Sequence, residues 1–390
     1  MMEEICEKIR DIQGKYYYGN GKRKRGWKEQ LKADYKKNIK EFFITHDTLI
    51  GFDFTNDCFN EEYMEENCPV YKYILYRVSK YKSPILYREA EKFRKINKNK
   101  YTTVDDPDSG SLLLQVLYED LYDVQKFRDS SLFIKEDKGK ADVDKKDENV
   151  DIMGDTMNSV QSSLNSYIEQ CLEKENANFK DIRKKSKEKY YPVSFTYFLE
   201  LFLRYKKKIL EGLEEVNASE LMETYHTLGN FIVIPTGCNG PRGVCILKDY
   251  WDLTLACIYN WYSQKENRED RIVKVIDNKC LEYNIGMIFA EESSLKKYVK
   301  WLNLFGTWDK FVEDNYLGDV KDENKIIENF VEKKNDEHYG RPRELWPGHF
   351  TAEVTPTDSE EYRKFFSNSS KYIKNRGFIM HQKLKKINSL

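Results

Sequence analysis

The sequence has few of the residues that mark a metal centre or a disulfide-stabilised fold. Its eight cysteines include no CxxC pair, and its five histidines are spread from His46 to His381. No cysteine lies near a histidine at the spacing of zinc ligands, so we expect no metal site. The first residues carry Glu3, Glu4 and Glu7 and not the basic start and apolar run of a signal peptide. We therefore expect a cytoplasmic location with no structural disulfides.

Long apolar runs and a large net charge are also missing. The strongest apolar run, 195–203, is interrupted by Glu200 and followed by Arg204, so we expect no membrane partner. The net charge of the chain is only −1. This value excludes a general attraction of the whole molecule to nucleic acid or to acidic lipid.

Aromatic residues are abundant, and the apolar residues recur mostly at helical spacing. The 28 tyrosines and 21 phenylalanines predict a core built largely from rings. The periodicity predicts a mainly α fold with a minor β component, arranged as a single helical domain with a few short strands. Helices are expected at 111–127, 194–216, 219–225, 249–262, 295–305, 308–316 and 358–376, and strands at 50–54 and 231–234. Asp155 is expected to cap a further helix ending near Cys171, and Gly306 and Gly377 to end the helices before them.

Two charged segments set the expected domain limits. Residues 135–150 are nearly all charged without periodicity, which is typical of a disordered loop. Residues 1–44 form a basic N-terminal extension, with a cluster at Lys22, Arg23, Lys24 and Arg25. This cluster is either a solvated helix surface or a patch that binds the nucleic-acid backbone. The folded domain is expected to span 45–385.

The segment 228–262 is the most informative part of the sequence. An apolar run is followed by the glycine-rich loop 237–243, which contains Asn239 and Arg242, and then by an apolar helix. We expect Asp249 to be the N-cap of this helix and Asp252 to lie in its first turn. The loop then has two interpretations. It is a tight turn in which Arg242 pairs with a carboxylate, or it is an anion pocket that uses free amides and the Arg242 guanidinium.

Several blocks of the sequence resemble a family of bacterial proteins of unknown function. The blocks are GDTMNS (154–159), GNFIVIPTGCNGPRG (229–243), KDYWDLTLACIYNWY (248–262), WLNLFGTWDKFVEDNY (301–316) and ELWPGHF (344–350). The resemblance implies that the residues on both sides of 135–150 belong to one folded unit. It implies no activity, cofactor or catalytic residue, so the cofactor stays unknown.

Three functions remain open at this point. The first is a binding module for a small molecule or a nucleic acid, in which polar groups converge among tryptophan rings. The polar candidates are Asn239, Arg242, Asp249, Asp252, Asn260, Asn315 and His349. The second is an enzyme of unknown class with a site near 237–252, for which Arg376 is a further candidate. The third is a protein–protein interaction scaffold, which predicts an exposed apolar patch and no cleft.

Overall fold

The computed structural model is mainly helical, with three two-stranded antiparallel sheets among the residues it describes. These residues are 2–16, 26–54, 111–130, 132, 154–156, 160–175, 177–190, 194–238, 250–264, 285–289, 291–350 and 355–388. The predicted fold class is therefore confirmed. The predicted loop at 135–150 lies outside the described residues.

The first half of the chain is almost entirely helical. Its elements are α1 (Met2–Gly14), α2 (Trp27–Asn38), α3 (Lys40–Thr45), α4 (Thr48–Gly51), α7 (Leu112–Leu121), α8 (Val124–Asp129), β1 (Gly154–Thr156), α9 (Val160–Tyr167), η3 (Ile168–Leu172), α10 (Glu173–Glu175) and α11 (Ala177–Tyr190).

The second half adds the longest helices and two hairpins of strands. Its elements are α12 (Ser194–Glu215), α13 (Ala218–Thr224), η4 (Leu228–Asn230), β2 (Phe231–Val233), α15 (Trp251–Ser263), η6 (Ile285–Met287), α16 (Glu292–Asn303), α17 (Trp308–Asp314), β3 (Val320–Asp322), β4 (Lys325–Ile327), β5 (Val331–Lys333), β6 (Tyr339–Pro342) and α18 (Ser359–Asn388).

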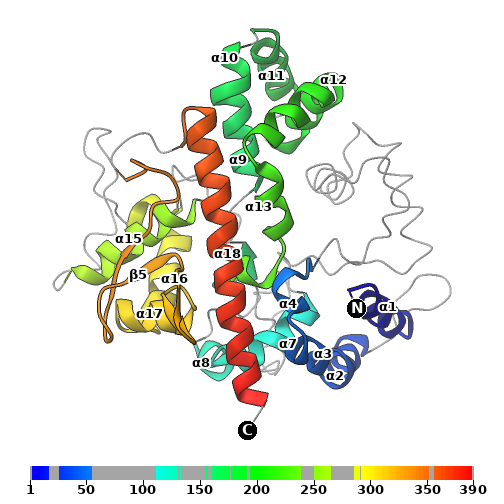
Figure 1. Ribbon diagram of the computed structural model, residues 1–390, viewed down its shortest axis with the longest axis vertical. Helices are drawn as coiled ribbons and strands as arrows, with labels where there is room; N and C mark the ends of the chain where they lie inside the picture. The colour runs from blue at the N-terminus through cyan, green and yellow to red at the C-terminus, as the bar shows by residue number, and fades with distance from the viewer. Residues whose placement is uncertain are drawn as a thin grey trace.

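Helix α18 is the axis of the molecule. It runs through the centre of Figure 1, with α15, α16 and α17 on one side and the N-terminal helices on the other. Helix α13, η4, α4, α3 and α7 all pack against it. Because it has neighbours around much of its circumference, its buried residues are not confined to one stripe. The prediction that Gly377 ends this helix is wrong, since the helix continues to Asn388.

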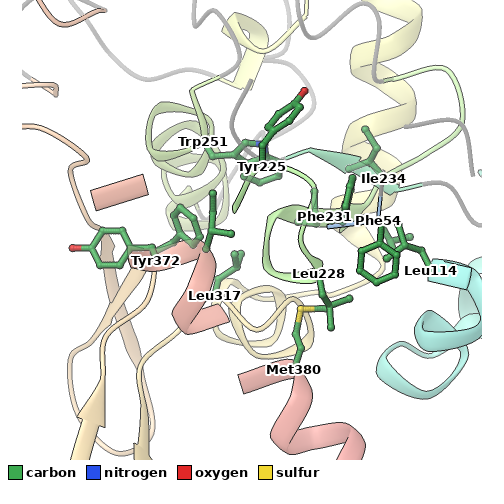
Figure 2. Packing of buried hydrophobic residues seen from close by; sticks show 14 of the residues in the cluster. Phe54, Leu114, Tyr225, Leu228, Phe231, Ile234, Trp251, Leu317, Tyr372 and Met380 are labelled. Atoms are coloured by element: carbon green, nitrogen blue, oxygen red, sulfur yellow. The ribbon is translucent and has the colours of Figure 1, made fainter. Parts of the chain in front are cut away.

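The core is built from rings, as predicted. Trp251, Trp301 and Trp346 are completely buried. Figure 2 shows Leu228 of η4 beside Met380 of α18, and these residues join the two elements at the centre of the core.

The predicted strand at 231–234 is confirmed as β2. The prediction that Asp155 caps a helix is wrong, because Asp155 lies in β1, the strand that pairs with β2. Residues 154–156 pair with β2 as β1, with Gly154 opposite Val233, and the next helix begins only at Val160. A backbone in a ladder is extended, so Asp155 does not cap a helix. The sequence around Asp155 resembles a helix start locally, and the pairing with β2 overrides that signal.

Other boundaries differ for local reasons. The predicted helix 111–127 is divided into α7 and α8, because Tyr122 is extended (φ −124°, ψ 154°). Its cap is Ser111, whose side chain accepts a hydrogen bond from the Leu114 amide at 3.3 Å. The predicted strand at 50–54 is wrong, because α4 occupies 48–51. Thr307 caps α17, and Gly306 precedes it in the left-handed region at φ +74°.

The N-terminal helices pack against the body of the protein through apolar contacts and ion pairs. Tyr35 of α2 is completely buried, and α2 contacts α7. Lys32 pairs with Glu119 at 3.7 Å, Lys36 pairs with the same carboxylate, and Lys40 pairs with Asp120. Acidic groups of α7 therefore neutralise part of the basic charge of this segment.

No helix in the described ranges is both long enough and apolar enough to cross a membrane.

Candidate functional site

The residues predicted for the site are only partly described. Asn239, Arg242 and Asp249 lie outside the described residues, as do Lys22, Arg23, Lys24 and Arg25. Asp252, Asn260, Asn315 and His349 are described. Both interpretations of the loop at 237–243 therefore remain predictions.

Oδ2 of Asp252 and Nδ1 of His349 are in direct polar contact, and both side chains are buried. The exposed fractions are 0% for Asp252 and 1% for His349. Oδ2 of Asp252 also accepts a hydrogen bond from the Leu345 amide at 3.1 Å, and Oδ1 accepts one from the Leu253 amide at 3.0 Å. The carboxylate thus ties the start of α15 to the turn at 345–349. Although Asp252 lies in the first turn as predicted, Tyr250 occupies the N-cap position that we assigned to Asp249.

Aromatic rings enclose this pair. The His349 ring lies 4.8 Å from Trp346 and 5.6 Å from Tyr250, and its plane is nearly parallel to Phe350. Burial raises the pKa of Tyr250 well above its usual value. A general base must reach the proton that it abstracts. A pair enclosed in this way joins two parts of the fold and does not present a base to a substrate.

We expect the Asp252→Asn variant to lose about 2 kcal/mol of unfolding free energy, because a buried charge-assisted hydrogen bond becomes a neutral one. His349→Gln should cost a similar amount. The double variant should lose less than the two single losses added together, because the two side chains interact directly. Urea unfolding followed by circular dichroism measures all four proteins. Asp336→Asn, at an exposed carboxylate, is the matched control. Additive losses would show that the pair is not coupled.

Asn315 lies in a second buried polar cluster, around Arg376. The side-chain amide of Asn315 donates to the Phe311 carbonyl oxygen at 2.9 Å. The backbone carbonyl oxygen of Asn315 accepts from Nε of Arg376, also at 2.9 Å. Both residues are completely buried. Arg376, a candidate of the enzyme hypothesis, therefore holds backbone segments together in the protein interior.

Asn260 lies on α15, about two turns after Asp252, and is half-buried. Of the four predicted residues that the structure describes, only Asp252 and His349 meet. Asp252, His349 and Asn315 make helix and turn contacts in the interior, and the convergence of the whole set on one open cleft stays a prediction.

A different group of residues lines an open cleft of about 550 Å³. The cleft lies between α8, the C-terminal half of α18, α17 and the segment that continues from α17 into β3. Three half-buried rings face it, those of Tyr316, Tyr339 and Phe378. The four described site candidates do not line it. The volume is in the range that holds a small organic ligand.

Five lysines stand on the walls of this cleft, against four acidic residues. The lysines are Lys126, Lys310, Lys321, Lys383 and Lys386, and the acids are Asp123, Glu313, Asp314 and Asp322. Lys310 pairs with Asp314 at 2.7 Å and with Glu313 at 3.1 Å, and the hydrogen bond to Asp314 raises the pKa of Lys310. Asp123 accepts a hydrogen bond from the Lys126 amide. Most of the acidic charge therefore already has a partner.

The other four lysines lack a carboxylate partner within the described parts of the chain. Nζ of Lys126 lies over the Phe305 ring, 5.0 Å from its centroid. Lys321, Lys383 and Lys386 are exposed and extend from β3 and α18. Their charges are available to an anion in the cleft, and nearby rings are available to a planar group. The sequence carries no signal for this group of lysines, because they are spread over more than 250 residues with no common motif.

Tyr316 shapes one wall of the cleft. Its backbone is in the left-handed region, at φ +59°, which is uncommon for a residue with a large side chain. The hydroxyl donates to the Leu121 carbonyl oxygen, and the ring packs edge-on against Tyr122 at 5.9 Å. Burial raises the pKa of Tyr316 well above its usual value, so the hydroxyl stays protonated at neutral pH. The wall between α7 and α17 is thus fixed before a ligand arrives.

The described residues contain no cluster of histidine, cysteine and acidic side chains that could hold a metal ion. Four cysteines in the described ranges, Cys6, Cys171, Cys238 and Cys257, are buried.

Comparison with protein-family models, with curated proteins and with solved structures gave no match for this chain. The resemblance of the sequence blocks to a bacterial family therefore stays a prediction, and the function has to be argued from the cleft.

Proposed function

We propose that this protein binds a small anionic ligand with a planar ring, of the chemical class of a nucleotide, in the cleft beside α18. The observation that carries the proposal is the convergence of four lysines, without carboxylate partners among the described residues, on one cleft with three accessible rings. Ammonium groups attract phosphate oxygens from several directions, and aromatic rings stack on a base.

The two alternative functions have less support. A scaffold would expose an apolar patch, but the large apolar side chains exposed in the described residues are Ile326 and Ile387, which stand on β4 and at the end of α18. An acid–base enzyme would need an accessible base, but Asp252 and His349 are enclosed. A binding module requires a cleft with available polar groups, and the lysines around Lys383 supply them.

The proposal also covers the cellular location of the protein and the family to which it belongs. We place the binding activity in the cytoplasm, as the sequence leads us to expect. We also propose membership of the bacterial family that the sequence blocks resemble. Fractionation of cells that produce the protein tests the first point.

Isothermal titration calorimetry tests the binding proposal. The probes are ATP, AMP, adenosine and inorganic pyrophosphate. We expect ATP to bind most tightly, because it supplies both the planar base and three phosphates. Adenosine lacks the charge and pyrophosphate lacks the ring, so both should bind more weakly. Absence of binding by every probe at millimolar concentration would contradict the proposal.

Charge reversal locates the site. Lys383→Glu should weaken ATP binding about tenfold, because it replaces an attraction by a repulsion at the cleft wall. Lys126→Glu should have a similar effect. Lys374→Glu is the matched control, since Lys374 is exposed on the same helix but lies outside the cleft. An equal loss in the control would mean that binding responds only to net charge.

A further inference from the structure

A pair of basic helices extends from the end of the molecule away from α8, at the top of Figure 1. Helices α11 and α12 pack against each other and are joined by three residues, so they run antiparallel. The Phe179 and Tyr205 rings face each other between them, 4.2 Å apart. Phe179 is completely buried. We call residues 177–208 the basic hairpin.

The charge of the basic hairpin is opposite to that of the remaining chain. Residues 177–208 contain ten basic and three acidic residues, a net charge of +7. Since the whole chain carries −1, the other residues together carry −8. The projecting element therefore carries a strong net positive charge, as part of the N-terminal segment also does. Such a separation of charge indicates a polyanionic partner.

The described side chains of the basic hairpin offer this charge to solvent. Lys180, Lys184 and Lys185 of α11 are exposed and have no ion pair within the described residues. Lys207 of α12 is 90% exposed, and within the described residues its ion-pair partner is Glu211, which is 64% exposed and lies 3.8 Å away. An exposed ion pair of this length contributes little, so Lys207 can exchange it for a phosphate.

The chemistry of the surface selects among polyanions. An amphipathic helix that enters a lipid surface needs an exposed apolar face. Here the described rings, Phe179 and Tyr205, pack against each other inside the hairpin, and Lys208 lies over the Phe179 ring. Binding to single strands relies on exposed rings that stack on bases, and these two rings are not available for stacking. Among the side chains of the hairpin that the structure describes, the exposed ones carry no aromatic ring, and several are lysines. Such a surface suits the regular phosphate backbone of a duplex.

We propose that the basic hairpin binds the phosphate backbone of double-stranded nucleic acid without sequence preference. Helix α11 has 14 residues and is therefore about 21 Å long, which spans several phosphates of one strand. The N-terminal segment is less suitable, because Lys32, Lys36 and Lys40 are paired with Glu119 and Asp120. This proposal uses none of the cleft residues and stands independently of the ligand proposal.

Fluorescence anisotropy of the full chain tests the proposal, with a 20-base-pair DNA duplex, an RNA duplex of the same length and a single DNA strand as probes. The triple variant Lys180→Gln, Lys184→Gln, Lys185→Gln removes three charges and keeps helix-forming residues. We expect at least a tenfold weaker affinity for a duplex at 0.1 M salt. The slope of log Kd against log salt concentration should become smaller by about 2 to 3, because three phosphate contacts are lost. The DNA and RNA arms show which duplex binds more tightly.

The matched control is Lys333→Gln, Lys334→Gln, Lys374→Gln, which removes the same charge at exposed sites elsewhere. This variant should bind within about twofold of the natural protein, because these lysines lie on other elements. Circular dichroism must show equal helix content in both variants; if the hairpin variant loses helix, the single variant Lys184→Gln, with an expected threefold loss, replaces it. Three results would overturn the proposal: no duplex binding at 50 mM salt, an equal loss in the control, or tighter binding to vesicles with one-fifth phosphatidylserine than to a duplex.

Discussion

Replacing Gly229 by alanine is expected to lower the free energy of unfolding by about 3 kcal/mol or more, because the added methyl group has no room. A Cβ atom at Gly229 would lie 1.9 Å from the carbonyl oxygen of Ile373 and 2.8 Å from the amide nitrogen of Gly377. Both atoms belong to the backbone of α18 and cannot rotate away as a side chain would. The methyl group would therefore force η4 away from α18, where most of the core meets. Urea unfolding followed by circular dichroism measures the loss.

Alanine variants at two other glycines serve as comparisons for the stability of Gly229→Ala. Gly51 ends α4, and a Cβ atom added there would have no described atom within 4 Å, so Gly51→Ala should leave stability unchanged or raise it slightly. At Gly212 the nearest atom is the Tyr167 hydroxyl at 3.0 Å, a side-chain atom that can give way, so alanine there should cost less than at Gly229. Equal stability of the Gly229→Ala and Gly51→Ala variants would contradict the close approach of η4 and α18.

The same contact explains why the predicted end of α18 is wrong. Glycine after a helical pattern often ends a helix in the left-handed conformation, and Gly306 adopts this conformation shortly after the end of α16. Gly377 instead lies within α18, facing Gly229, where a Cβ atom would be 3.4 Å from the Gly229 amide nitrogen. The need for a small residue at this position comes from an element nearly 150 residues away. Local spacing carries no information about such a partner.

Apolar periodicity predicts the core well. Helix α15 is expected to be buried nearly all round, and Trp251, Leu255 and Trp261 are indeed buried. The short hairpins β3–β4 and β5–β6 are not predicted. Their strands have only three or four residues, and few of these residues are buried. Lys325 and Glu332 are charged and exposed. A strand with this composition gives no period-2 signal.

The candidate site is predicted less well, for a physical reason. Asp252 and His349 are both identified from the sequence, but their pairing depends on a turn 97 residues after Asp252. The cleft lysines Lys126, Lys321 and Lys383 come from three separate elements. Their meeting is a property of the tertiary fold. The charge of the basic hairpin is visible in the sequence, but only the packing of α11 on α12 places it on one projecting element.

Replacing Arg376 by leucine is expected to lower the free energy of unfolding by about 3 to 5 kcal/mol, because several buried acceptors lose their donors together. Nη1 of Arg376 donates to the carbonyl oxygens of Gly229 and Phe231, at 2.8 and 2.7 Å, and Nε donates to that of Asn315 at 2.9 Å. Nη2 donates to the Tyr122 hydroxyl at 3.1 Å. One guanidinium thus joins η4, β2, the end of α7 and the end of α17 to α18, and leucine satisfies none of these contacts.

Conservative and exposed variants distinguish this role from a general effect of substitution in α18. Arg376→Lys keeps the charge, but a single ammonium group cannot reach four acceptors in different directions, so we expect most of the loss to remain. Tyr122→Phe removes one of the four partners and should cost about 1 kcal/mol. Lys374→Ala, at an exposed position of the same helix, should change stability by less than about 0.5 kcal/mol. If Arg376→Leu unfolds at the same urea concentration as Lys374→Ala, the guanidinium does not hold these segments together. A loss confined to Arg376→Leu, with Arg376→Lys fully stable, would mean that the buried charge matters and the fork of hydrogen bonds does not.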